Sequence, residues 1–182
     1  MASETERADE DHELVARFAA GDESAFDALV RRYQKPIYWL ARRYVANDAD
    51  AKDVAQRALV QAFLKVKELR DGASFRSWVY RVAANLSLNL LRDRKPTTTL
   101  ADDTAVALTR EPLVEEEAQK RLRAAVKLLP PQQRLVVELR IYEELPFAAV
   151  GEVADCSEES AKVSFHHALK KLRVLMNEEN DQ

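Results

Sequence analysis

Apolar residues recur every three or four positions along most of this chain, which is the spacing of one face of an α-helix. No segment alternates apolar and β-branched residues with polar ones in the way a half-buried strand would. The helical pattern stops at Lys95–Thr99 and returns at about Val114. The pattern therefore predicts an all-α fold in which two helical domains are joined by a flexible linker.

Breaks in the pattern predict the elements and the domain limits. In the first half, helices are predicted over Leu14–Ala20, Ser24–Val45, Asp48–Leu69 and Ser74–Arg94. Pro36 lies inside the second of these, and we expect it to kink that helix or to begin a new piece of it. The expected organisation is an acidic, disordered N-terminus over residues 1–13, a first domain over 14–95, a linker over 96–113, a second domain over 114–176 and a tail over 177–182.

The second domain contains two helical segments separated by a short turn. Phe147, Val150 and Val153 recur every three residues and give the first segment one apolar side. Gly151 lies beside them and, having no side chain, permits the second segment to approach closely. Ser157 follows the break in the pattern and is a favourable N-cap for the second segment. This arrangement predicts a helix-turn-helix, for which DNA is the first candidate partner.

The second helix of this motif has an apolar side and a cationic side. Its inner face is predicted to consist of Ala161, Phe165, Ala168, Leu169, Leu172, Leu175 and Met176. The other side carries residues that suit a recognition helix, namely Lys162, Val163, His166, His167, Lys170 and Arg173. The alternative is an amphipathic hairpin whose polar side is only solvated.

Charge is unevenly distributed along the chain. The formal net charge is −3, but residues 1–27 hold nine acidic and two basic residues, residues 28–110 eight and sixteen, and residues 111–182 fourteen and ten. The middle of the chain is therefore basic. Because non-specific affinity for DNA comes from phosphate neutralisation, we expect the protein alone to bind DNA weakly and a partner to hold it there.

The predicted helix Asp48–Leu69 has a separate polar patch opposite its apolar stripe. The buried stripe is predicted to consist of Val54, Ala55, Ala58, Leu59, Ala62, Phe63, Val66 and Leu69. The outward patch consists of Asp53, Gln56, Arg57 and Val60. This patch is a candidate docking face for another protein, or alternatively an ordinary solvated surface.

The predicted helix Ser74–Arg94 also carries a polar face. Arg81, Asn85, Asn89 and Arg92 recur about one turn apart, and these residue types suit contacts to phosphates and base edges. Three aromatic residues nearby are candidates for stacking an unpaired base or for packing in the core: Phe75, Trp78 and Tyr80.

No catalytic site is predicted, and no cofactor or metal is expected. His12 lies in the acidic N-terminal segment, no Ser/His/Asp or Cys/His arrangement occurs, and three glycines form no phosphate-binding loop. The single cysteine, Cys156, excludes an intramolecular disulfide, and no Cys/His cluster has zinc spacing. No apolar stretch is long enough to span a membrane, so we expect no membrane insertion and a cytoplasmic protein that is not an enzyme.

The order and spacing of these motifs resemble those of the extracytoplasmic-function (ECF) sigma factors of bacterial RNA polymerase. The segments that carry the resemblance are Asp53-Val54-Ala55-Gln56 followed by Phe63, the run from Phe75-Arg76-Ser77-Trp78 to Asn85, Asn89-Leu90-Leu91-Arg92, Leu129-Pro130 to Arg134, and the helix-turn-helix. Together they span about residues 14–175. The resemblance implies a subunit that binds core RNA polymerase and directs promoter-specific initiation by recognising and melting promoter DNA.

The resemblance also implies roles for individual positions. Core-polymerase binding, at the clamp of the largest catalytic subunit, would fall on Asp53, Gln56 and Val60. The minus-ten promoter element would be melted and read by Arg70, Arg81, Asn85, Asn89 and Arg92. The minus-thirty-five element would be read in the major groove by Ser160, Lys162, Val163, His166, His167 and Lys170. A further implied partner is an anti-sigma factor that covers the polymerase-binding faces.

Four positions depart from the family's usual residues. Arg57 stands in place of an acid and Glu159 in place of glycine, while Ser164 and His167 each stand in place of arginine. The loss of arginine removes bidentate guanine readers and fixed charge. We therefore predict an unusual contact to the minus-thirty-five element that varies with pH, because histidine titrates near neutrality.

Two other classes of function compete with this interpretation. A stand-alone helix-turn-helix repressor would need a dimerising element, and no heptad seam long enough to form one is found. A purely protein-binding helical module would not need the Arg/Asn face or the cationic helix. The sequence therefore favours the sigma factor, with the repressor as the alternative.

Overall fold

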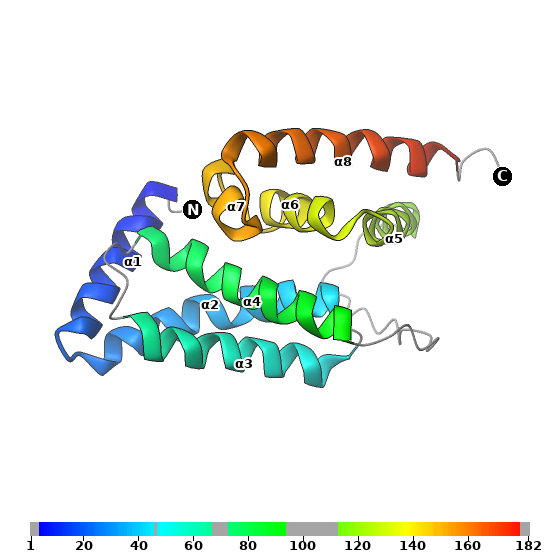
Figure 1. Cartoon of the computed structure of the whole chain (residues 1–182). Helices are drawn as coiled ribbons and strands as arrows, with labels where there is room; N and C mark the ends of the chain where they lie inside the picture. Colours follow the sequence, from blue (N-terminus) through cyan, green and yellow to red (C-terminus); the bar gives the residue numbers. More distant parts are fainter. Residues whose placement is uncertain (1–3, 46, 67–72, 94–112, 179–182) are drawn as a thin grey trace. The chain divides into compact units, whose positions relative to one another are not determined.

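The computed structural model describes residues 4–45, 47–66, 73–93 and 113–178, and all regular structure within these ranges is helical (Figure 1). The chain divides into two compact units, residues 1–102 and 103–182. The all-α prediction with two helical domains is therefore confirmed. The predicted linker lies outside the described residues except for Leu113, the first residue of a helix. None of the described helices is long and apolar enough to cross a membrane.

The first unit consists of α1 (Glu4–Ala19), α2 (Glu23–Tyr44), α3 (Asp48–Lys65) and α4 (Ala73–Asp93). Helices α2, α3 and α4 pack against one another, and α1 packs across α2 and α4 (Figure 1). Fully buried side chains from three helices form the core, among them Leu29, Ile37, Leu40, Val54, Phe75 and Val79. The helical periodicity therefore identified these core residues correctly.

Local capping defines where α2 and α3 begin. Gly21 has a φ of +102°, which suits glycine, and the Asp22 carboxylate then accepts a hydrogen bond from the backbone N–H of Ser24 at 3.0 Å. Asn47 caps α3 in the same way. Pro36 does not end α2, which is continuous to Tyr44, although a proline cannot donate the usual hydrogen bond within a helix.

The N-terminal segment differs from the prediction made for it. A helix runs from Glu4 to Ala19, which corrects the expectation of disorder for residues 4–13; residues 1–3 of the predicted N-terminal segment lie outside the described residues. Val15 and Phe18 are buried, and so is the carboxylate of Asp11. Acidic composition concealed this helix because the carboxylates of Glu6, Asp9, Glu10 and Glu13 lie on the solvent side of an apolar stripe.

The second unit consists of α5 (Leu113–Lys127), α6 (Pro131–Ile141), α7 (Phe147–Ala154) and α8 (Glu158–Glu178). Helix α8 packs against α5, α6 and α7. One apolar cluster joins α5, α6 and α8 through Ala125, Val126, Leu129, Val137, Ala168 and Leu172. The carboxylate of Glu138 is buried in α6 beside Arg134, whose Nε lies 2.9 Å from it.

The turn between α7 and α8 has the geometry of a helix-turn-helix. A Cβ atom on Gly151 would lie 2.7 Å from the carbonyl oxygen of Cys156, so a side chain there would collide with the turn. Asp155 adopts the left-handed conformation with a φ of 56°, which turns the chain out of α7. Ser157 Oγ then accepts a hydrogen bond from the Ser160 N–H at 3.1 Å and caps α8, as predicted.

Candidate functional site

The predicted docking patch on α3 is exposed. Asp53, Gln56 and Arg57 are all accessible, and Val60 is 51% exposed. The guanidinium of Arg57 lies 3.4 Å from the carboxylate of Asp53, so the residue that departs from the family pattern forms an exposed ion pair within the patch. Such a pair contributes little stability and leaves both side chains available to a partner.

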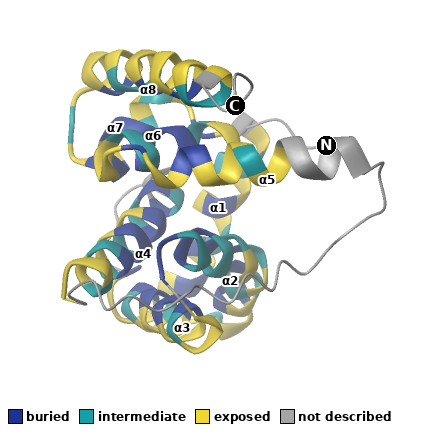
Figure 2. Cartoon of the chain, turned by 90° about the vertical axis from the view of Figure 1, so that its right-hand side faces the viewer, coloured by how far each residue is buried: buried dark blue, intermediate teal, exposed yellow. Residues whose placement is uncertain are grey.

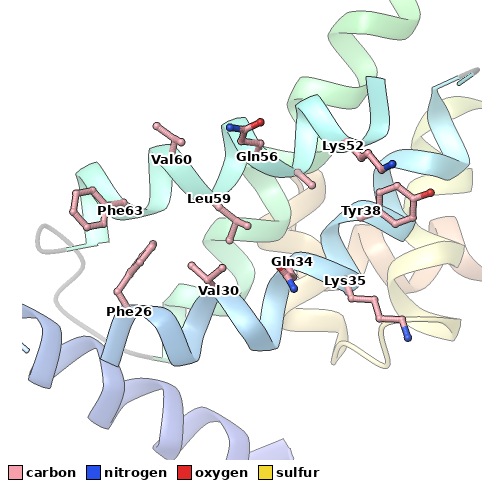
Figure 3. A pocket seen from close by; sticks show the side chains of 11 residues that line it. Phe26, Val30, Gln34, Lys35, Tyr38, Lys52, Gln56, Leu59, Val60 and Phe63 are labelled. Carbon is pink, nitrogen blue, oxygen red and sulfur yellow. The ribbon is translucent and has the colours of Figure 1, made fainter. Parts of the chain in front are cut away.

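This patch borders an apolar groove between α2 and α3. The groove has a volume of about 710 Å³ and is lined from α2 by Phe26, Val30, Gln34, Lys35 and Tyr38, and from α3 by Lys52, Ala55, Gln56, Leu59, Val60 and Phe63. Figure 3 shows Val30 of α2 pointing toward Leu59 of α3 across the groove. Gln56 and Val60 therefore form the α3 wall of a concave apolar surface.

Polar groups close one end of this groove. The Tyr38 hydroxyl donates to the Asp48 carboxylate at 2.5 Å, and the Lys52 ammonium lies 2.6 Å from the same carboxylate. The contacts with Lys52 and Tyr38 lower the pKa of Asp48 below its ordinary value, and the contact with Asp48 raises the pKa of Tyr38. This network gives the groove one polar and one apolar end.

An aromatic cluster forms the apolar end. The Phe63 ring lies 5.4 Å from Phe18 and 5.2 Å from Phe26, measured between ring centroids. The predicted stripe placed Phe63 in the core, but 47% of it is exposed. Leu64 beside it is also exposed. Within the described residues α3 ends at Lys65, soon after these side chains, and Phe63 extends the apolar surface of the groove.

The predicted DNA-reading face of α4 is a continuous exposed stripe. Arg81, Asn85, Asn89 and Arg92 are all exposed, and their spacing of three or four residues places them on one side of the helix. Arg92 also lies near Asp93, with 3.6 Å between Nε and Oδ1. Arg70 lies outside the described residues, so its predicted role remains untested.

Two of the three aromatic residues near this stripe are not available for stacking. Phe75 is completely buried and Tyr80 nearly so, and both rings pack against the ring of Tyr33 from α2. Of the two alternatives, packing in the core is therefore confirmed for Phe75 and Tyr80, and base stacking by them is wrong. Helical periodicity could not reveal this, because the ring that covers them belongs to another helix. Trp78 is half-buried and keeps part of its ring accessible.

The predicted recognition face of α8 is exposed along its length (Figure 2). The exposed residues are Ser160, Lys162, Val163, His166, His167 and Lys170. Ala161, Ala168 and Leu172 are buried, as predicted, while Leu169 is 37% exposed instead of buried. The apolar and cationic sides of α8 are thus separated as a recognition helix requires.

Two of these side chains already have partners at the start of α8. The Lys162 ammonium lies 2.8 Å from the Glu158 carboxylate one turn earlier, and this contact raises the pKa of Lys162. The Ser160 hydroxyl contacts the hydroxyl of the capping Ser157 at 2.8 Å. The Glu158 carboxylate therefore partly neutralises the positive charge of Lys162, which reduces the net attraction of Lys162 for phosphate.

Among the described residues, no group of three or more His, Cys, Asp or Glu side chains is arranged to hold an ion.

The exposed faces on α3 and α4 both belong to the first unit, and the face on α8 belongs to the second. Sequence reasoning missed the α2 wall of the groove, because residues such as Val30 have the same helical spacing as the core.

Comparisons with known proteins place both units in one family. The chain matches sigma-70 region 2 over residues 29–97 and sigma-70 region 4 over residues 125–174. It is 30% identical over 162 residues to the RNA polymerase sigma-H factor of Pseudomonas aeruginosa, an alignment that covers 81% of this chain and 84% of that protein. The chain belongs to the ECF sigma factors of bacterial RNA polymerase.

Other comparisons agree with this membership. The ECF RNA polymerase sigma factor SigW of Bacillus subtilis is 28% identical to this sigma factor over 173 residues, which cover 87% of this chain and 92% of SigW. The fold is shared with the structure of CnrH in complex with the cytosolic domain of CnrY, at a TM-score of 0.73 and 22% identity, over 92% of this chain and 97% of CnrH.

Membership of the family establishes the general function. The sigma factor binds core RNA polymerase and promoter DNA and directs promoter-specific transcription initiation. The family consists of initiation factors and not of enzymes. A stand-alone helix-turn-helix repressor is not favoured, because such a protein has no need for the sigma-70 region 2 that matches most of the first unit.

Proposed function

We propose that this sigma factor uses three separate faces: the α3 patch with its groove for the polymerase clamp, the Arg/Asn stripe of α4 for the minus-ten element, and the cationic side of α8 for the minus-thirty-five element. The observation that carries the proposal is the groove of about 710 Å³ between α2 and α3, bordered by Gln56 and Val60. In domain terms, residues 14–95 would act on the clamp and the minus-ten element, and residues 114–176 on the minus-thirty-five element, joined by a linker over 96–113.

The groove has the properties of a site for a partner helix. Val60, Phe63 and Leu64 are each about half exposed or more, and neighbouring apolar side chains that remain in water mark an interaction surface. An apolar groove between two helices accepts the apolar face of another helix. A helix of the polymerase clamp's coiled coil would bury Val60 while Asp53 and Gln56 donate and accept polar contacts at the edge.

The stripe on α4 suits single-stranded promoter DNA. Arg side chains attract phosphates, and Asn side chains donate to and accept from base edges. Because Phe75 and Tyr80 are buried, base stacking would fall to the half-buried Trp78. Arg70, which precedes α4, would add a phosphate contact.

The cationic side of α8 suits the major groove of duplex DNA. A helix in this position contacts base edges with residues near its N-terminus, and Ser160, Val163 and His167 follow one another there at helical spacing. Lys170 lies about one turn beyond His167 and would contact phosphate, together with Lys162 and His166.

Regulation by an anti-sigma factor follows from the same groove. The related CnrH is known in a complex with the cytosolic domain of CnrY. A regulatory protein that covered Val60 and Phe63 would compete directly with the clamp. We also propose that the protein acts in the cytoplasm, where polymerase and promoter DNA are found, and that it has no catalytic activity of its own.

Separate variants of the three faces test the assignment. Asp53→Ala/Gln56→Ala should weaken binding to core RNA polymerase at least about tenfold, since a few central residues dominate most interfaces. Asn85→Ala/Asn89→Ala in the holoenzyme should weaken binding of a single-stranded oligonucleotide that carries the non-template minus-ten sequence. Lys162→Ala/Lys170→Ala should weaken binding of a duplex minus-thirty-five fragment.

Asp27→Ala is the matched control, because Asp27 is exposed on α2 and does not line the groove. It should leave all three affinities unchanged. If each face variant reduced only its own affinity, the assignment would be supported. If the α3 variant bound core polymerase as tightly as the wild type, the clamp assignment would be wrong.

A further inference from the structure

Asp11 is the one carboxylate of α1 that the described structure places in the interior of the first unit. Only 1% of Asp11 is exposed. Its side chain lies 2.5 Å from the guanidinium of Arg32 and accepts a hydrogen bond from the Tyr33 hydroxyl, both from α2. Glu10, its neighbour, contacts the same Arg32 at 2.6 Å but is exposed. The match to sigma-70 region 2 begins at residue 29, so Asp11 lies outside it.

Through Tyr33, Asp11 is linked to the beginning of α4. The Tyr33 ring packs edge-on against Phe75 at 5.4 Å and against Tyr80 at 6.3 Å between centroids. The positive charge of Arg76 also acts on Asp11. A single buried carboxylate therefore connects α1, α2 and, through the Tyr33 ring, the first two turns of α4.

Stability alone does not explain a carboxylate in this position. Taking a charge out of water costs several kcal/mol, and replacing a buried ion pair by apolar side chains is often neutral or stabilising. The carboxylate instead fixes the orientation of its partners. It accepts a hydrogen bond from the Tyr33 hydroxyl and so orients the Tyr33 ring, which packs against the aromatic side chains of α4.

We propose that Asp11 is a positioning residue for promoter opening, which holds the first turns of α4 through Tyr33 and thereby sets the orientation of the stripe Arg81, Asn85, Asn89 and Arg92. The inference rests on the proposed assignment of α4 to the minus-ten element. The N-terminal helix α1 is thus part of the DNA-reading apparatus without touching DNA.

The test uses Asp11→Asn and Tyr33→Phe, with Glu10→Gln as the matched control. All three proteins are assembled with core RNA polymerase, and binding of the single-stranded minus-ten oligonucleotide is measured beside the affinity for core. Asp11→Asn and Tyr33→Phe should weaken oligonucleotide binding by between about 2-fold and 30-fold, the range for mutations remote from the ligand, with core affinity unchanged. Glu10→Gln should not weaken it.

The control separates positioning from simple electrostatics. Asp11→Asn and Glu10→Gln each remove one negative charge from the same helix, so long-range attraction alone predicts equal, slightly tighter DNA binding for both. A positioning role predicts weaker oligonucleotide binding for Asp11→Asn and no weakening for Glu10→Gln. Because Asp11 and Tyr33 act through one link, the double variant should lose no more than the larger single loss.

Two results would overturn the inference. One is oligonucleotide binding at the wild-type level in both Asp11→Asn and Tyr33→Phe. The other is an equal loss of oligonucleotide and core affinity, which indicates general destabilisation. If Asp11→Asn did not fold, Tyr33→Phe would decide, because it keeps the ring contacts with Phe75. If the wild-type holoenzyme itself failed to bind the oligonucleotide, the α4 assignment would fall as well, which is a distinguishable outcome.

Discussion

Single residues determine the geometry of the turn between α7 and α8. Gly151 was predicted to permit close approach of two helices, and it does so at the backbone of the turn, where the carbonyl oxygen of Cys156 leaves no room for a Cβ atom. Asp155 supplies the left-handed residue and Ser157 the cap. The sequence revealed Gly151 and Ser157 because each has a distinctive local chemistry.

Gly151→Ala should destabilise the second unit by about 1–3 kcal/mol, the usual cost of overpacking, despite the better helix propensity of alanine. Both tryptophans, Trp39 and Trp78, lie in the first unit, so their fluorescence reports only on that unit. In urea, circular dichroism should show that the second unit of Gly151→Ala unfolds at a lower urea concentration than that of the wild type. The unfolding transition followed by tryptophan fluorescence should stay unchanged. The neighbouring exposed variant Glu152→Ala should stay within about 0.5 kcal/mol of wild type. Equal stability of the two variants would contradict the contact at Cys156.

Asp11 gives the stability of the first unit a specific pH dependence. Burial raises the pKa of Asp11 above its ordinary value of 3.8, and this outweighs the opposing effects of Tyr33, Arg32 and Arg76. A carboxyl whose pKa is higher in the folded than in the unfolded state stabilises the fold at a pH below its unfolded-state pKa. This contribution is lost as the pH rises through the folded-state pKa. Relative to Asp11→Asn, the wild type should therefore lose stability as the pH rises above 3.8. Tryptophan fluorescence in urea from pH 3.5 to 7 measures this difference, and a gain for the wild type would contradict it.

At the scale of elements, helical periodicity predicted which side of a helix faces outward. It could not predict which side chains of other helices pack against it. The outward residues of α3, α4 and α8 were predicted from spacing alone, because a helix repeats at a fixed angle. Phe63 was placed in the core and is half exposed, two residues before the end of α3. Phe75 and Tyr80 were candidates for stacking and are covered by Tyr33, which no local pattern records.

The cationic side of α8 predicts a measurable salt effect. Lys170→Ala should weaken binding of the minus-thirty-five duplex about equally for all sequences and reduce the slope of log affinity against log salt by about 1, as expected for one lost phosphate contact. Lys127→Ala on α5, also exposed, is the matched control and should leave the slope unchanged. A slope unaffected by Lys170→Ala would remove this residue from the interface.

The two exposed histidines of α8, His166 and His167, are expected to contribute to the same contact. His166→Ala/His167→Ala should therefore weaken binding of the minus-thirty-five duplex or change its base preference. If the double variant kept the wild-type affinity and base preference from pH 6 to pH 8, neither histidine would contribute to recognition.

At the scale of the whole molecule, the charge distribution predicts that the protein alone binds DNA weakly. The first 27 residues carry nine acidic side chains against two basic ones, and the last third is also acidic. A protein of this charge distribution neutralises few phosphates, so its affinity for promoter DNA should come mostly from the holoenzyme. The two-domain organisation could be predicted from the break in periodicity. The α2 wall of the groove and the role of α1 could not, because both depend on packing between helices distant in sequence.

Promoter-directed transcription with purified components tests the central claim most directly. The protein is combined with core RNA polymerase on a library of promoter templates, beside core alone and the variant Asp53→Ala/Gln56→Ala. We predict discrete start sites with the wild type, none with core alone and few with the variant, and the enriched templates would define the promoter consensus. Absence of polymerase-dependent initiation, together with sequence-specific DNA binding by the protein alone, would contradict the account.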